Sequence, residues 1–448
     1  MWHHKAGVTV LVTRVSGMAL TDFPIRPPLG LQPGNGLVLL PGGEALFAAL
    51  VEAMDAAQLS IHLETYIFDF QGAPLAVADA LARAAHRGVA VRLVVDGVGT
   101  GPLPPVWQQR FDAAGVQYRV YAPLGRLGLL LPSRWRRLHR KLCVVDGTLG
   151  FCGGINLLDD YFDPRDGALT FPRFDFAVCC TGPLVDAMDA TMLQLWWRLL
   201  AASKARQRQF KAAWQAFRAV PRLGGSGSSA GLTDAVWHAA QPRHLPSTHL
   251  VRPPHVTDAT AMLVLRDNIW HRADIERTYL KAVGEARTEV LLANAYFVPG
   301  RRLRKALVMA VRRGVRVRVL LQGRYEGFMQ YHAARPVYKQ MLDAGIDIRE
   351  YTPSALHAKV AVVDGAWATV GSSNLDPLSL LLAREANVVV EDAAFAQDLR
   401  ARLEHAMLNG GRVLDPARYA LRSWHERALD RVAFVLMRLA LWVTGNRY

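Results

Sequence analysis

The sequence predicts a duplicated α/β layered fold with largely parallel strands. Helix-forming and strand-forming segments alternate along the chain, and the same succession of segments occurs twice. A polar motif also recurs with the same internal spacing near the end of each succession. The 448 residues, of which 51% are hydrophobic, are enough for two such units with a large core.

The first half alternates as a layered α/β unit should. Its predicted elements are a helix over 44–57, a strand over 59–68, a helix over 76–87, a strand over 89–96, a helix over 106–114 and a strand over 116–121. Gly88 and Gly115 follow the second and third helices and are typical residues for ending a helix. Residues 89–96 are almost entirely apolar, as expected for a strand buried on both faces.

The second half repeats this order. Its predicted elements are a helix over 274–286, a strand over 290–297, a helix over 303–313, a strand over 315–321, a helix over 336–344 and a strand over 346–351. Gly314 and Gly345 end two of these helices, 226 and 230 residues after Gly88 and Gly115. Strands that alternate with helices at this spacing imply right-handed parallel crossovers.

Composition divides the chain into five regions. They are an N-terminal extension rich in Pro and Gly (1–35), a first half (36–220), a linker containing Gly-Gly-Ser-Gly-Ser-Ser (221–256), a second half (257–410) and a C-terminal amphipathic tail (411–448). We find neither a signal peptide nor a run of about 18 apolar residues that would span a membrane.

One polar motif occurs in each half. Each copy has the pattern H-x-K-x4-D, with a glycine 14 residues and an asparagine 17 residues after the histidine. The residues are His139, Lys141, Asp146 and Asn156 in the first copy, and His357, Lys359, Asp364 and Asn374 in the second. One such pattern could arise by chance, but two copies with matched Gly and Asn positions indicate a functional site.

These paired motifs resemble the H-K-D motifs of the phospholipase D superfamily. The segment Arg-Trp-Arg-Arg-Leu-His-Arg-Lys at 134–141 is similar to bacterial cardiolipin synthases, especially the B-type without an N-terminal membrane anchor. The resemblance covers most of residues 36–410. It implies a duplicated phospholipase D-like α/β/α sandwich with mixed, largely parallel sheets, whose two pseudo-twofold-related halves form one site that needs no metal or other cofactor.

Each motif supplies one histidine. Substitution at a phosphodiester through a covalent intermediate needs a nucleophile and also an acid for the leaving alcohol. Two half-sites that meet across a pseudo-twofold axis provide both. The resemblance favours His139 as the nucleophile and His357 as the acid and base, although the symmetry of the motifs leaves this order open.

The other motif residues have distinct predicted roles. On a strand, a lysine two residues after the histidine faces the same side, so Lys141 and Lys359 can neutralise the phosphoryl oxygens. Asn156 and Asn374 are expected to bind the same oxygens. The aspartates come seven residues after the histidines and would face the opposite way, so we interpret Asp146 and Asp364 as fixing the turn after the strand, which is also their usual role in the family.

A neutral nucleophilic imidazole needs a hydrogen-bond acceptor at its second nitrogen. Members of the family use a downstream acidic residue from the same half or from the other half. The candidates here are Glu385 and Asp175, which lie 28 and 36 residues after the histidines of their own halves. His62, Asn294 and Tyr296 lie on predicted strands that could border the site or could simply pack in the core.

The formal net charge of +15 and the pI of about 10.0 favour a polyanionic partner, either an anionic membrane or a nucleic acid, unless they reflect a generally Arg-rich proteome. No separate nucleic-acid-binding module is recognisable, so no nucleic acid is expected as a partner. The four cysteines have no metal-binding spacing and are predicted to be buried thiols. The oligomeric state is not indicated.

Three segments without a counterpart in the other half combine arginines with apolar residues. Residues 125–137 could be a membrane-contacting loop or a buried insertion, and residues 196–218 a basic helix that faces the membrane or packs. In the tail, Arg427, Arg431 and Arg438 fall within about 40° of one another on a helix, although Phe434 falls in the same stripe. This helix is predicted to hold the protein on the membrane without crossing it, or else to pack on the domain.

The resulting prediction is a cardiolipin synthase-type phosphatidyltransferase. It would transfer a phosphatidyl group between phosphatidylglycerol molecules through a phosphohistidine, with release of glycerol, as a peripheral protein on the cytoplasmic face of the bacterial inner membrane. The alternatives are a phospholipase D-type hydrolase, with water as the acceptor, and a phosphodiesterase or nuclease acting on nucleic acid.

Overall fold

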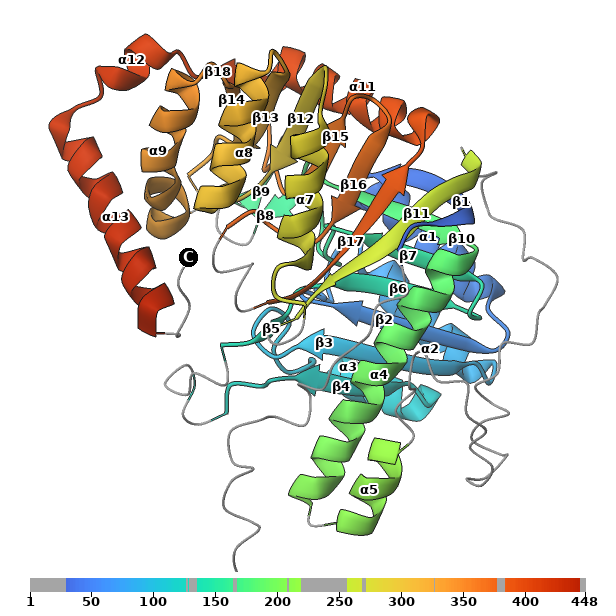
Figure 1. Cartoon of the computed structure of the whole chain (residues 1–448). Helices are drawn as coiled ribbons and strands as arrows, with labels where there is room; N and C mark the ends of the chain where they lie inside the picture. Colours follow the sequence, from blue (N-terminus) through green and yellow to red (C-terminus); the bar gives the residue numbers. More distant parts are fainter. Residues whose placement is uncertain are drawn as a thin grey trace, which may run out of the picture.

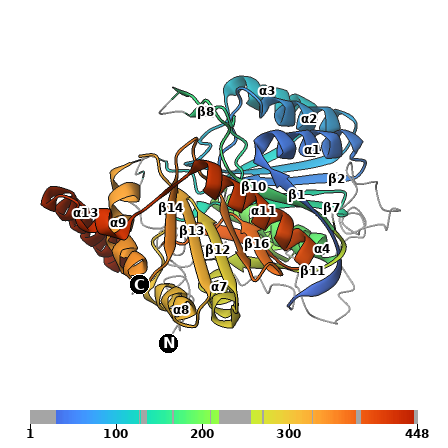
Figure 2. The same cartoon turned by 90° about the horizontal axis from the view of Figure 1, so that it is seen from above.

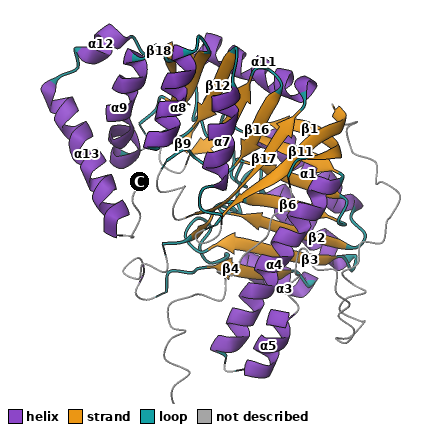
Figure 3. Ribbon diagram, in the orientation of Figure 1, coloured by secondary structure: helices purple, strands orange, loops and turns teal. Residues whose placement is uncertain are grey.

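The structure is a computed structural model that describes residues 30–125, 128, 135–163, 167–207, 209–218, 256–267, 271–325, 327–376 and 383–443. Nearly all of the predicted linker and most of the predicted N-terminal extension lie outside these residues. Helices and strands interleave along the part that is described (Figure 3).

The first half contains most of the elements expected from its sequence. Its strands are β1 (Gln32–Pro41), β2 (Ser60–Thr65), β3 (Ala90–Asp96), β4 (Gln117–Tyr121), β5 (Arg137–Leu138), β6 (Lys141–Val145), β7 (Leu149–Gly153) and β10 (Phe176–Thr181), with a separate hairpin of β8 (Phe162–Asp163) and β9 (Gly167–Ala168). Its helices are α1 (Gly42–Ala56), α2 (Leu75–His86), α3 (Pro105–Ala114), α4 (Pro183–Arg206) and α5 (Phe210–Arg218).

The second half follows the same plan. Its strands are β11 (Val256–Arg266), β12 (Glu289–Asn294), β13 (Arg316–Gln322), β14 (Asp347–Tyr351), β15 (Lys359–Val363), β16 (Trp367–Gly371), β17 (Ala383–Glu391) and β18 (Gly411–Val413). Its helices are α7 (Asp274–Glu285), α8 (Arg301–Arg312), α9 (Phe328–Asp343), α11 (Ala393–Gly410), α12 (Pro416–Ala420) and α13 (Trp424–Val443).

One large sheet runs through both halves (Figure 1). Its order is β18-β14-β13-β12-β15-β16-β17-β11-β1-β10-β7-β6-β2-β3-β4. Reading outward from the central antiparallel pair β1–β11, each strand of one half meets its counterpart in the other: β10 and β17, β7 and β16, β6 and β15, β2 and β12. The duplication read from the sequence is therefore a pseudo-twofold symmetry of the fold.

The sheet is mixed, as predicted, but its parallel pairs are fewer than its antiparallel ones. Parallel pairing joins β2 to β3 and β3 to β4, and joins β12 to β13 and β13 to β14, where a helix connects successive strands. Each motif strand instead forms an antiparallel hairpin, β6 with β7 and β15 with β16. These hairpins are short because Asp146 and Asp364 adopt a positive φ (52° and 51°) at the turn.

Helices cover both faces of each half. In the first half α1, α2 and α3 pack on one face and α4 on the other, and in the second half α7 and α8 lie opposite α11 (Figure 2). The inner helices α4 and α11 share a central core with strands of both halves. The two halves are thereby held together by buried apolar surface, which fixes the motifs relative to each other.

Three elements depart from the expected boundaries. β1 begins at Gln32, inside the predicted extension, because the side chain of buried Asn35 bonds to the carbonyls of Gln32 and Ala259 and stabilises this Pro- and Gly-rich strand. α9 begins at Phe328 and includes Pro336, since packing against α13 stabilises a helix that its proline alone would shorten. The predicted helix over 196–218 is divided between α4 and α5.

All four cysteines are buried free thiols. Among the described residues, no helix is both long enough and apolar enough to cross a bilayer.

Candidate active site

Each motif histidine is attached through its backbone to the opposite half of the molecule. The two-residue strand β5, which precedes His139, pairs in parallel with the start of β17, and the His139 N–H donates to the Arg384 carbonyl at 3.0 Å. In the other half-site, Leu356 bridges to Phe174, and the His357 N–H donates to the Phe174 carbonyl at 2.9 Å. Each histidine therefore lies beside the residue that directly precedes an acid of the other half.

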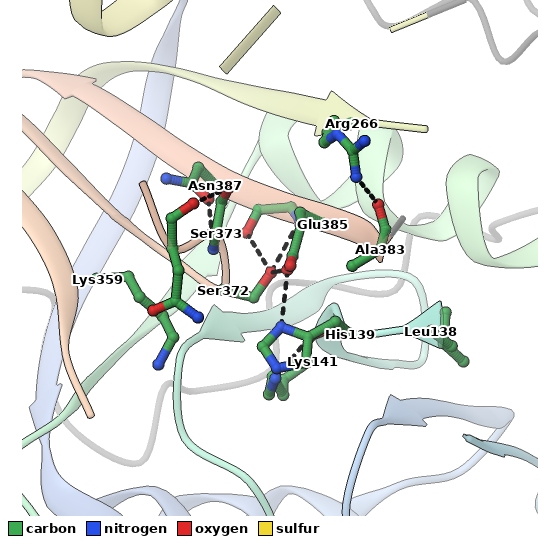
Figure 4. A network of polar contacts seen from close by, with 12 residues as sticks. Leu138, His139, Lys141, Arg266, Lys359, Ser372, Ser373, Ala383, Glu385 and Asn387 are labelled. Carbon is green, nitrogen blue, oxygen red and sulfur yellow. Dashed lines mark hydrogen bonds and ion pairs between the residues drawn. The ribbon is translucent and has the colours of Figure 1, made fainter. Parts of the chain in front are cut away.

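This backbone pairing decides which acid serves which histidine. His139 Nδ1 lies 3.0 Å from Glu385 Oε2 (Figure 4), and His357 Nδ1 lies 2.6 Å from Asp175 Oδ2. Of the two arrangements that the sequence allowed, the structure has the crossed one. The carboxylates are 0% and 4% exposed, whereas the histidine side chains are 15% and 24% exposed. The bond at Nδ1 leaves Nε2 of each ring as the nitrogen that can meet a substrate.

The lysines lie on the same side as the histidines, although the histidines precede the strands. β6 and β15 begin at Lys141 and Lys359, and each ammonium turns back to donate to the carbonyl of its own histidine. Lys359 lowers the pKa of His139, and Lys141 lowers the pKa of His357. Each motif thus acts electrostatically on the other, and Figure 4 shows Lys359 near the first motif.

Burial controls the protonation of the site. It lowers the pKa of His139, assisted by Lys141 and opposed by Glu385, and it lowers the pKa of His357 well below its usual range. Burial also lowers the pKa of Lys141 to about 7 and raises the pKa of Asp175 to about 7. Both imidazoles are therefore neutral in the free protein at neutral pH, and an arriving anion would restore the lysine charge.

The asparagines hold the loops that follow the hairpins. The Asn156 side-chain carbonyl accepts from the Ile67 N–H at 3.3 Å, so its NH2 group is the end that can donate to a ligand. Asn374 is buried, and the following residue, Leu375, donates its N–H to the side chain of Asn294. Asn294 is paired in register with Lys359, so it borders the site as one of the two possibilities for it predicted.

The motif aspartates lie at the far ends of the hairpins from the histidines. The Asp146 carboxylate accepts the N–H groups of residues 58–60, at the start of β2. Asp364 accepts the N–H groups of residues 287–289, at the start of β12. Burial alone would raise the pKa of Asp364, but these N–H donors outweigh it and hold the pKa below its usual range. This geometry fits a turn-fixing role and gives neither aspartate access to a substrate.

Comparison with known proteins now bears on this arrangement. The family model described as "Cardiolipin synthase, PLD-like domain" matches residues 50–170 and 279–407, and each match contains one motif. The chain belongs to the cardiolipin synthase family of the phospholipase D superfamily. It is accordingly a phosphatidyltransferase of the phospholipase D type.

Curated relatives agree along nearly the whole chain. Cardiolipin synthase B of Salmonella typhimurium (strain LT2) is 35% identical over 409 residues, which cover 91% of this chain and 89% of that protein. Cardiolipin synthase B of Escherichia coli (strain K12) is 35% identical over 407 residues, with the same coverage. The crystal structure of phosphatidylserine synthase from Haemophilus influenzae Rd KW20 has a TM-score of 0.63 at 12% identity, and covers 94% of this chain and 96% of that one. The last similarity supports the fold alone.

Two residues beside the site of this cardiolipin synthase-family protein were not singled out from the sequence. The Tyr66 ring lies 4.8 Å from the His139 ring, and the Ser372 hydroxyl donates to Glu385 at 2.5 Å. The pseudo-twofold symmetry puts Ala295 at the place of Tyr66 and Gly154 at the place of Ser372. The two half-sites therefore differ in structure. Aligning the halves on their motif aspartates would have revealed both substitutions.

Other candidate residues lie elsewhere. His62 bonds to Asp189 at 2.8 Å and to Arg92, away from the motif histidines, so packing explains its burial. Tyr296 is partly buried against the central core. Most of the predicted membrane-contacting loop 125–137 lies outside the described residues.

Proposed function

We propose that the protein makes cardiolipin by transferring a phosphatidyl group from one phosphatidylglycerol to another. The observation that carries this proposal is the crossed pair of half-sites, each with a histidine, a lysine and a buried acid, in a chain that is 35% identical to cardiolipin synthase B over 91% of its length. Two proton-handling imidazoles suit a double displacement at one phosphodiester.

In the first step, Nε2 of one histidine attacks the phosphorus of phosphatidylglycerol. The bond from phosphorus to the glycerol oxygen breaks, and the second histidine gives that oxygen its proton, so that free glycerol leaves. The phosphatidyl group remains bound to the first histidine. Lys141 and Lys359 balance the charge on the phosphoryl oxygens, and the NH2 group of Asn156 can donate to them.

In the second step, a hydroxyl of another phosphatidylglycerol attacks the phosphohistidine. The second histidine accepts the hydroxyl proton, the bond between phosphorus and nitrogen breaks, and cardiolipin leaves. The carboxylate on Nδ1 of each ring stabilises the positive charge that the ring acquires during the cycle.

We assign His139 as the nucleophile and His357 as the acid and base. Asp175, whose pKa burial raises to about 7, lies 2.6 Å from His357, so this pair can still hold a proton at neutral pH for the leaving oxygen. Mapping an acid-labile phosphoryl adduct by mass spectrometry tests the order. An adduct on His357 would reverse it.

The substrate and the net charge of +15 support peripheral association with an anionic membrane. We place the protein on the cytoplasmic face of the bacterial inner membrane, where its four thiols would stay reduced.

The deciding experiment incubates the purified protein with vesicles that contain labelled phosphatidylglycerol and separates the lipid products. Cardiolipin together with free glycerol is the expected result. Phosphatidic acid would indicate a hydrolase instead, and cleavage of nucleic acid without lipid turnover would indicate a nuclease.

Two histidine variants test whether the motifs form one site. H139A and H357A should each lose nearly all turnover, because each removes one of the two required groups. Near-normal activity in either folded variant would refute the shared site.

A further inference from the structure

The C-terminal helix α13 is attached to the protein along one narrow edge. Asp430, Ala433 and Met437 are buried, and at 100° per residue they fall within about 60° of the helix circumference. Asp430 anchors this edge, because it bonds to His332 of α9 at 2.7 Å and to Arg422 at 2.7 Å. Both views show α13 beside α9 at the periphery of the molecule (Figures 1 and 2).

A separate face of α13 is apolar and exposed. Its five large aliphatic side chains are 46–53% exposed and fall within about 120° of the circumference. They are Leu429, Val432, Val435, Leu436 and Leu439. A contiguous apolar surface of this kind on a soluble protein usually marks an interaction site.

Arginines border this face on the side opposite the buried edge. Arg427, Arg431 and Arg438 are exposed and fall within about 40° of one another. None of the three has an ion pair with a carboxylate of the residues that the structure describes. An apolar helix face bordered by free arginines is the pattern of a helix that lies in the plane of an anionic bilayer surface.

We propose that the outer face of α13 docks on an anionic lipid bilayer while its inner edge stays packed on α9. The helix is then both packed and interfacial, which combines the two alternatives that its sequence leaves open. The apolar side chains would enter the boundary between headgroups and acyl chains, and the arginines would bind lipid phosphates. A second copy of this chain fits less well, because two such faces would bring six arginines together in addition to the net charge of +15 on each copy.

The test measures sedimentation of the full-length protein with vesicles of phosphatidylcholine alone or with 30% phosphatidylglycerol. We expect binding to the anionic vesicles, and a loss of about 100-fold in affinity at low salt for R427Q/R431Q/R438Q. V432Q/V435Q/L436Q should also bind weakly and should remain weak at high salt. M309Q/L408Q is the matched control, since these exposed apolar residues lie on α8 and α11, and it should bind normally.

Because the substituted side chains are exposed, the melting temperature of these variants should be unchanged. Vesicle binding equal to wild type in both α13 variants would overturn the proposal. So would a dimer in analytical ultracentrifugation that the apolar-face variant dissociates without weakening vesicle binding. The proposal depends on the proposed function only for the choice of lipid. Turnover of phosphatidylglycerol in detergent micelles should be unaffected by these substitutions, so a wrong activity would appear there and a wrong docking face only with vesicles.

Discussion

Glu385 should control His139, the histidine of the opposite half. The substitution Glu385→Gln keeps the shape of the side chain and a possible acceptor for the Ser372 hydroxyl, but removes the negative charge 3.0 Å from His139 Nδ1. Because Glu385 raises the pKa of His139 against the effect of burial, its loss should lower that pKa further. His139 would then accept positive charge less readily during phosphoryl transfer.

The magnitude follows from the geometry. Two unit charges about 4 Å apart attract by about 4 kcal/mol at the effective dielectric constant of about 20 that suits protein sites. Part of this attraction remains in the Gln variant, whose amide oxygen is still a dipole facing the ring. We therefore expect kcat to fall by roughly 10²- to 10³-fold, since each 1.36 kcal/mol corresponds to about a factor of ten. KM should change less, because the lysines that meet the substrate are retained.

The assay combines turnover of labelled phosphatidylglycerol with NMR titration of ¹⁵N-labelled histidine. In Glu385→Gln the titration of His139 should move to lower pH, while that of His357 stays near its wild-type position. Asp175→Asn is the matched control and should act on His357. A shift of His357 in Glu385→Gln, with His139 unchanged, would refute the crossed pairing.

Three further predictions concern stability and positioning. Asp175→Asn should raise the melting temperature more at pH 8 than at pH 5. The reason is that burial raises the pKa of Asp175 to about 7, so the stability of the protonated form is lost as pH rises towards and through 7; equal calorimetric gains at both pH values would contradict this. Asp364→Ala should lower the free energy of unfolding in urea by roughly 2–4 kcal/mol, and Asp364→Asn by less, with kcat per folded molecule retained; lost turnover in a folded variant would instead indicate a catalytic role. Tyr66→Ala should lower kcat by about tenfold by freeing the His139 ring, while Tyr66→Phe stays near wild type; an equal loss in both would implicate the hydroxyl.

Periodicity in the sequence was sufficient to predict the elements that position the site. The apolar run 89–96 and the glycines after the predicted helices gave β3, α2 and α8 nearly at their observed ends, because burial on both faces and helix termination are local requirements. Mixed pairing was harder to predict, since hairpin and crossover strands have similar compositions. Pro33, Gly34 and Gly36 hid the start of β1, whose stability comes from its place between β10 and β11.

The motif residues and their duplication were likewise readable from the sequence, because their chemistry needs particular side chains at constant spacing. The sequence by itself therefore determined the fold class, the two motifs and the family. Only the tertiary structure decided that Glu385 serves His139 and Asp175 serves His357, that Tyr66 and Ser372 make the half-sites unequal, and that α13 packs by one edge and exposes another face. These features depend on contacts between segments up to 246 residues apart, and no local pattern specifies which distant segment a strand or a ring will meet.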